Sequence, residues 1–148
     1  MRKLIVLFIA GSIGLKVMAQ ADGFGIGIIL GEPTGLSGKL WLTQKTAVDG
    51  ALAWSLWDGG AVHIHADFLV HNFNLINVSQ GQLPLYIGIG PRIKLANDPM
   101  LGVRVPFGLA YLFGSAPLDV FLELVPILEL IPASDFHFNS AIGIRYFF

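Results

Sequence analysis

HFNSAIGIRYFF, residues 137–148, ends the chain and decides its fold. Its even positions carry mostly large apolar side chains, among them Ile142, Ile144 and Tyr146. Its odd positions carry small, polar or charged ones, including Gly143 and Arg145. Because successive side chains of a β-strand point to opposite faces, this alternation predicts a strand with one apolar face and one small or charged face.

The same two-faced pattern recurs upstream, with branched and aliphatic residues on one parity and Gly, Ala and charged residues on the other. Lengths of roughly 9–12 residues suit strands that cross a membrane at a tilt. The sequence therefore predicts eight strands. The seven upstream segments are 23–30, 35–43, 46–56, 61–71, 83–94, 101–112 and 118–128.

The charged residues of these segments lie opposite the aliphatic ones. Arg or Lys facing lipid costs about 2–4 kcal/mol near the bilayer midplane, so the aliphatic face is expected outside. The pattern predicts an all-β fold, an eight-stranded antiparallel up-and-down transmembrane β-barrel. A soluble barrel with its apolar face inward is the alternative, but its exterior would be unusually poor in Lys and Glu.

Prolines and loops complicate this assignment. Pro106 lies within a predicted strand, where it removes a ladder hydrogen bond and predicts a bulge. Pro126, near the end of the next segment, raises the same question. The 72–82 connection is long for a periplasmic turn, whereas the connection at residues 31–34 is short for an extracellular loop.

A leader precedes the strands. Arg2 and Lys3 form a basic start, residues 4–13 are apolar, and Ala19 or Ala21 offers a cleavage position. This arrangement predicts a secretory signal peptide at residues 1–19 and one barrel domain at residues 20–148. A transmembrane anchor is the alternative, but the apolar run is short for a bilayer about 30 Å thick.

Composition narrows the function. Without residues 1–19, six basic residues remain against ten acidic ones, a formal charge of −4, so no nucleic-acid surface is expected. The chain has no cysteine, so neither a disulfide scaffold nor a thiolate metal site is expected. Past the leader no run of about 18 uncharged apolar residues occurs. A closed barrel then satisfies the backbone in lipid, and an outer-membrane location follows.

An interior polar network is expected, because eight strands leave an interior filled by side chains rather than an aqueous channel. Five positive charges, counting Lys94 with the four Lys and Arg of the network below, oppose four negative ones there, which indicates paired charges and a plug instead of a pore. The predicted network comprises Lys39, Asp49, His63, His65, Asp67, Arg92, Arg104, Asp119, Glu123 and Arg145.

Some of the same residues could in principle bind a metal ion or catalyse a reaction. The spacing of His63, His65, Asp67 and His71 along one strand would let two imidazoles reach one metal, but hydrogen bonding within a polar interior is favoured because no second ligand cluster is evident. We therefore expect no metal, no cofactor and no catalytic residue. A lipid-modifying enzyme recruiting Ser55, Ser134 and His137, or a narrow channel, remains the alternative.

Six segments resemble an uncharacterised family of small outer-membrane-protein β-barrels. The resemblance implies an eight-stranded barrel similar to OmpX and the OmpA membrane domain, without defined catalytic residues. The final residues, Tyr146 and Phe148, resemble the signal read by barrel-assembly machinery. We expect a monomer in contact with outer-membrane lipid, with a structural or surface-interaction role. The segments are Leu30–Gly38, Asp49–Leu56, Pro84–Arg92, Gly102–Gly108, Pro117–Glu123 and Ala141–Phe148.

Overall fold

The computed structural model describes residues 22–31, 34–55 and 60–148. The predicted signal peptide, residues 1–19, lies outside these ranges, as does Leu56 at the end of the third predicted strand. Within the ranges, no helix is long and apolar enough to cross a membrane.

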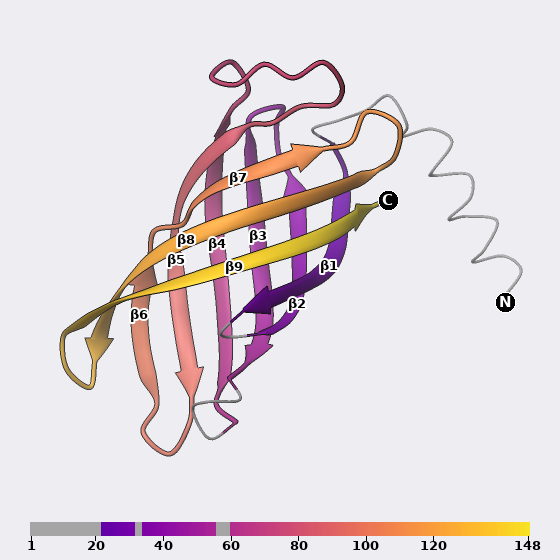
Figure 1. Ribbon diagram of the computed structural model, residues 1–148. Coiled ribbons are helices and arrows are strands. Elements are labelled where there is room, and N and C mark those ends of the chain that lie inside the picture. Colours follow the sequence, from indigo (N-terminus) through magenta and orange to yellow (C-terminus); the bar gives the residue numbers. More distant parts are fainter. Residues whose placement is uncertain (1–21, 32–33, 56–59) are drawn as a thin grey trace, which may run out of the picture.

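The described chain folds into one antiparallel sheet that closes on itself (Figure 1). Neighbouring strands pair in sequence order, and β9 pairs back with β1, so the prediction of an all-β, up-and-down barrel is confirmed. The strands are β1 (Phe24–Gly31), β2 (Thr34–Trp41), β3 (Thr46–Trp54), β4 (Val62–Asn72), β5 (Leu85–Leu95), β6 (Met100–Arg104), β7 (Phe107–Leu112), β8 (Leu118–Ile131) and β9 (Asp135–Phe147).

The sixth predicted strand is divided in two. Arg104 of β6 pairs with Ile127 of β8, and Phe107 of β7 pairs with Leu124, so the register continues across the break. The break lies at Pro106, which has no N–H for the ladder. The bulge predicted at Pro106 is not formed, and the register shift of this wall strand lies between Leu101 and Gly102 instead. β6 and β7 therefore occupy one strand position, and the barrel wall has eight strand positions.

Pro126 is accommodated in the neighbouring strand. It lies inside β8, beside the break, and its carbonyl accepts a hydrogen bond of 3.0 Å from the Val105 N–H. Its nitrogen therefore faces the interrupted strand and not β9, and β8 continues to Ile131. The predicted end of this strand at residue 128 was too early.

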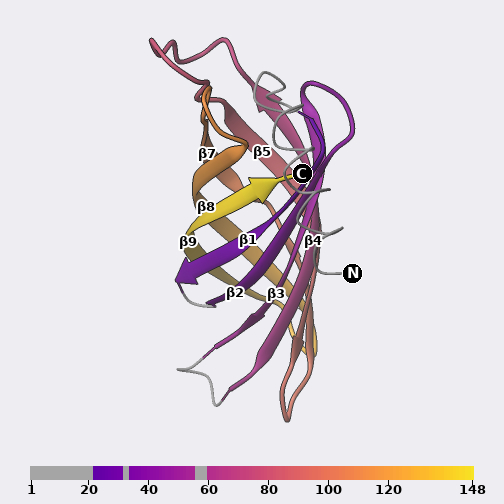
Figure 2. The same cartoon turned by 90° about the vertical axis from the view of Figure 1, so that its right-hand side faces the viewer.

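The strands are staggered around the barrel. Following registered neighbours once around the wall from Asp135 of β9 leads back to β9 at Arg145, ten residues farther along. Such a stagger requires strands that are tilted to the barrel axis, and Figure 2 shows this tilt.

The predicted parity holds around the wall. Apolar residues such as Leu52, Ile89 and Leu122 are 48–58% exposed on the outside. Large side chains fit inside because glycine faces them: a Cβ at Gly143 would collide with the Phe121 ring. Another at Gly108 would collide with Tyr86. The outside is thus continuously apolar and the interior is filled.

The two ends of the barrel differ. The connection between Asn72 and Leu85 is the long one, and it lies at the end that holds the C-terminus (Figure 1). Its return arm bridges Gln82 to Leu112 of β7. At the opposite end β8 ends at Ile131 and β9 begins at Asp135, so this connection is short.

Candidate functional site

The interior polar network is the candidate functional site. All ten predicted members point into the barrel. Nine are at most 5% exposed, and the His65 side chain is 10% exposed. Burial of so many charges is tolerable only where they are paired and hydrogen-bonded, so their partners decide what the site is.

The Arg145 cluster lies in the middle of the barrel. Arg145 Nη2 lies 3.1 Å from Asp49 Oδ2, and Nη1 lies 3.4 Å from Asp119 Oδ2. Its Nε donates to Ser37 Oγ at 2.9 Å, and the guanidinium lies 3.9 Å from the centre of the Phe121 ring. One side chain from β9 thereby links β2, β3 and β8. Gly27 is its cross-strand neighbour on β1 and leaves it room.

The Arg104 cluster occupies the other side of the interior. Arg104 Nη2 donates to Glu123 Oε2 at 3.0 Å, its Nε lies 3.2 Å from Asp67 Oδ2, and its Nη1 donates to His65 Nδ1 at 2.7 Å. Tyr86 donates its hydroxyl to Glu123 Oε1 at 2.9 Å. Glu123 thus serves two donors on two strands. Tyr86 was not among the predicted network residues, because it carries no formal charge.

The Arg92 cluster lies toward the end away from the C-terminus. Arg92 Nη1 forms an ion pair with Glu129 and lies 3.0 Å from His137 Nε2, while Nη2 lies 2.7 Å from His63 Nδ1. Glu129 is 1% exposed, yet it was missing from the predicted network. It shares the parity of Asp119 and Glu123, and that signal would have found it had the predicted strand not stopped at residue 128.

Including Glu129 equalises the interior charges. Lys39, Arg92, Arg104 and Arg145 are buried together with Asp49, Asp67, Asp119, Glu123 and Glu129. Half-buried Lys94 is the fifth cation, so five cations meet five carboxylates among the described residues. The predicted ratio of five to four was wrong by this one residue. A balanced interior indicates charge pairing and not a ring selective for one ion sign.

Lys39 is held differently. It is fully buried, and its Nζ lies 2.8 Å from His71 Nε2 and 4.2 Å from the centre of the Trp41 ring. Within the described ranges no carboxylate comes within ion-pair distance of its ammonium. His71 also packs against Phe73 and Tyr86. An aromatic layer therefore closes the interior at the end that carries the C-terminus.

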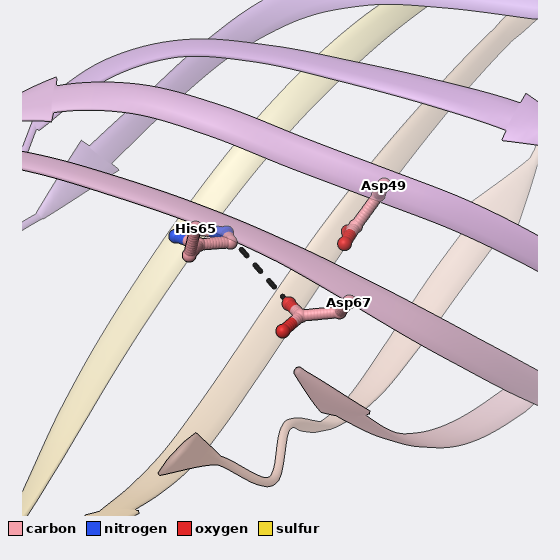
Figure 3. Close-up of side chains that lie close together, drawn as sticks. All are labelled: Asp49, His65 and Asp67. Carbon is pink, nitrogen blue, oxygen red and sulfur yellow. Dashed lines mark ion pairs between the residues drawn. The ribbon is translucent and has the colours of Figure 1, made fainter. Parts of the chain in front are cut away.

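Asp49, His65 and Asp67 form the group whose spacing suits a metal ion, with one ligand atom from each within 4.8 Å of the others (Figure 3). Asp49 and Asp67 are direct cross-strand neighbours, an arrangement that needs a nearby cation. Arg145 contacts Asp49, and Arg104 contacts both Asp67 and His65. A metal would have to displace these guanidinium groups, so the geometry favours ion pairs.

The histidines of β4 do not converge. His63 lies beside Arg92, His65 beside Arg104 and His71 beside Lys39, each in a different layer of the interior. The three imidazoles do lie on the common strand face that their spacing predicts. They do not form a shared set of metal ligands. In this arrangement each imidazole accepts a hydrogen bond from a buried cation.

The fold is similar to that of a solved β-barrel. The crystal structure of the N-terminal β-barrel domain of Pseudomonas aeruginosa OprF aligns with a TM-score of 0.69 and 13% sequence identity, covering 87% of this chain and 99% of that one. At this identity the likeness establishes the fold alone. Neither a protein-family model nor a curated protein sequence matches the chain.

Proposed function

We propose that this chain is a small integral outer-membrane protein whose barrel is a closed plug with a structural or surface-interaction role. The observation that carries the proposal is that apolar side chains lie on the outer face of the barrel wall and charged side chains on its inner face. Apolar side chains such as Ile89 are exposed outside, while four cations and five carboxylates are buried within and a fifth cation, Lys94, is half-buried. In lipid this arrangement satisfies the backbone through barrel closure and keeps charge away from hydrocarbon.

The packing of the interior supports a plug over a channel. The Arg145, Arg104 and Arg92 clusters cross the interior at successive levels, and the Trp41, His71 and Phe73 rings cover one end. Conduction would require several buried ion pairs to separate together. An eight-stranded wall has little free space in which such a rearrangement could occur.

The proposed surroundings follow from the same residues. The exposed apolar belt contacts outer-membrane lipid, the leader directs export, and the chain acts as a monomer without a cofactor or nucleic-acid partner. The last residues, Tyr146 and Phe148, are the proposed contact for barrel-assembly machinery. Support comes from the backbone there: the Phe148 N–H donates to the Phe24 carbonyl at 2.9 Å, where the barrel closes. Membership of the uncharacterised small-barrel family belongs to this proposal.

Spin labels test the orientation of the wall. We expect a label at Leu52 to be relaxed by lipid-soluble oxygen and protected from a water-soluble nickel chelate in vesicles. A label at Lys45, in the turn between β2 and β3, is the matched control and should show the opposite preference. Nickel access at Leu52 equal to that at Lys45 would contradict a lipid-facing wall. So would recovery of the protein in the soluble periplasm without a gel-mobility shift on boiling.

Planar bilayers and lipid analysis separate the plug from its alternatives. We expect no discrete conductance steps from the purified protein and no change in the mass spectrum of lipid A from cells that overproduce it. Reproducible conductance steps would support the narrow channel. A modified lipid A species that disappears when His137 is replaced would support the enzyme.

A further inference from the structure

β9 extends beyond its neighbour β1. The registered pairs between the two strands run from Gly25 with Phe147 to Gly31 with Ala141. Residues 135–140 of β9 continue past this point, paired with β8 on one side. Among the described residues none pairs with them on the other side. At this end the barrel wall has a strand edge six residues long.

Backbone hydrogen bonds at the other end of β9 show which groups this edge presents. The Phe147 N–H donates to Pro117, on the β8 side, whereas the Phe148 N–H donates to Phe24 of β1. Since N–H and C=O groups alternate along a strand and the β8 register is unbroken, even-numbered residues face the edge. Phe136 and Phe138 therefore direct backbone groups toward the open side.

Two local contacts agree with this assignment. The Phe136 N–H is satisfied by the carboxylate of the adjacent Asp135 at 2.9 Å, a substitute for a ladder partner. Pro126, the registered neighbour of Phe138, directs its carbonyl to Val105 and away from β9. Pro126 and Phe138 are thus not hydrogen-bonded to each other, and the Phe138 N–H and C=O point toward the open edge of β9.

The sequence explains why β1 stops short. Only Glu32 and Pro33 separate Gly31 from Thr34, where β2 begins, and proline cannot continue a hydrogen-bonded strand. At about 3.3–3.6 Å per residue, two residues are too few to run beside six. The edge also lacks the lysines, prolines and bulges that usually protect exposed edges. Instead Phe136 and Phe138 are 57% and 59% exposed beside it.

We propose that residues 135–140 of β9 form a docking edge for an extended segment of another polypeptide, which adds as an antiparallel strand in line with β1. The β1–β9 ladder sets its chemistry: apolar side chains outward beside Phe138, small ones inward beside His137 and Asn139. A second copy does not fit this edge. Copies inserted alike in one membrane meet by a rotation about the membrane normal, which cannot set β9 antiparallel to itself.

A peptide copying β1 tests the edge. The probe is Phe24–Leu30 with flanking lysines and a fluorescein label, and anisotropy reports its binding to the purified protein in detergent micelles. Phe138→Pro removes the outward N–H at a position where an edge strand tolerates proline. Phe138→Ala is the matched control, because it removes the ring and keeps the N–H. We expect at least tenfold weaker binding for Phe138→Pro and a smaller loss for Phe138→Ala.

Amide hydrogen exchange in the unaltered protein supplies a readout that does not depend on how the variants fold. We expect the Phe138 amide to exchange rapidly without the peptide and slowly with it, while the Asn139 amide, bonded to β8, stays protected throughout. Equal binding to Phe138→Pro and the unaltered protein would overturn the proposal. So would protection of the Phe138 amide without the peptide, whether it arose from lipid, from a second copy or from the chain itself.

Discussion

The Arg145 cluster and the Arg92 cluster use the same ion-pair chemistry at two depths. Arg145 and its two carboxylates are at most 5% exposed, and an aromatic ring covers the guanidinium. Arg92 pairs with one carboxylate and two imidazoles, and the His137 side chain is 34% exposed. Water can therefore replace His137 at the second cluster, whereas every partner of Arg145 is buried. Depth should therefore decide how much each interaction matters.

Arg145→Met should have the largest effect. It leaves Asp49 and Asp119 buried without their guanidinium, and removal of one partner of a buried pair costs about 3–5 kcal/mol. The measurement is urea unfolding of the protein in lipid vesicles, followed by tryptophan fluorescence. Arg145→Lys is the control and should lose less, because it keeps the charge. A free energy of unfolding within about 1 kcal/mol of the unaltered value would contradict the role of this cluster.

Glu123→Ala should come next. It removes the acceptor of both Arg104 and Tyr86, although Arg104 retains Asp67. Unsatisfied buried donors cost about 1–3 kcal/mol, more where one is charged, so a loss of about 2–3 kcal/mol is expected in the same unfolding assay. Glu123→Gln should recover part of it, since an amide oxygen can still accept from Tyr86. Equal losses for both variants would mean that the volume of the side chain matters and not the hydrogen bonds.

Glu129→Gln probes the more open cluster. Arg92 loses its carboxylate but keeps His63 and His137, and the His137 side chain is 34% exposed to water. The expected loss is about 1–2 kcal/mol, below that of either deeper variant. Thermal unfolding in detergent, read by gel mobility without boiling, provides a second measure. A loss as large as that of Arg145→Met would remove the distinction between the two depths.

His137→Ala should have the smallest effect. Its ring is one-third exposed, so water can take its place beside Arg92. Substitutions at such positions usually change stability by no more than about 0.5 kcal/mol. His63→Ala, which removes a buried ring from the same guanidinium, is the matched comparison and should cost more. If the two variants lost the same amount, exposure would not be what separates them.

Alternation along each strand was sufficient to predict the wall of this molecule. It placed all ten predicted network residues inside. The bulge predicted at Pro106 is a break between β6 and β7 instead. It missed Glu129, because the predicted strand ended at residue 128. Continuation of β8 past Pro126 depends on the direction in which the Pro126 nitrogen faces, and that depends on the neighbouring strand.

The partners within the network were beyond reach of the sequence for a different reason. Arg145 meets Asp49 and Ser37 across 96 and 108 residues of chain. Those contacts depend on the stagger accumulated over every strand pair. A change of two residues in any one register would keep all side chains on the same face and still change every partner. The open edge of β9 has the same origin.

The stagger of ten residues, together with the pairing of β9 with β1, has a consequence for the order of assembly. Arg145 reaches Asp49 only when β9 pairs with β1. Until then, the carboxylates of β3 and β8 lack their cation and must stay hydrated or be shielded by another protein. Pairing of β9 with β1 is thus the same event as neutralisation of the carboxylates in the middle of the barrel. A chain shortened at its C-terminus would lose both together.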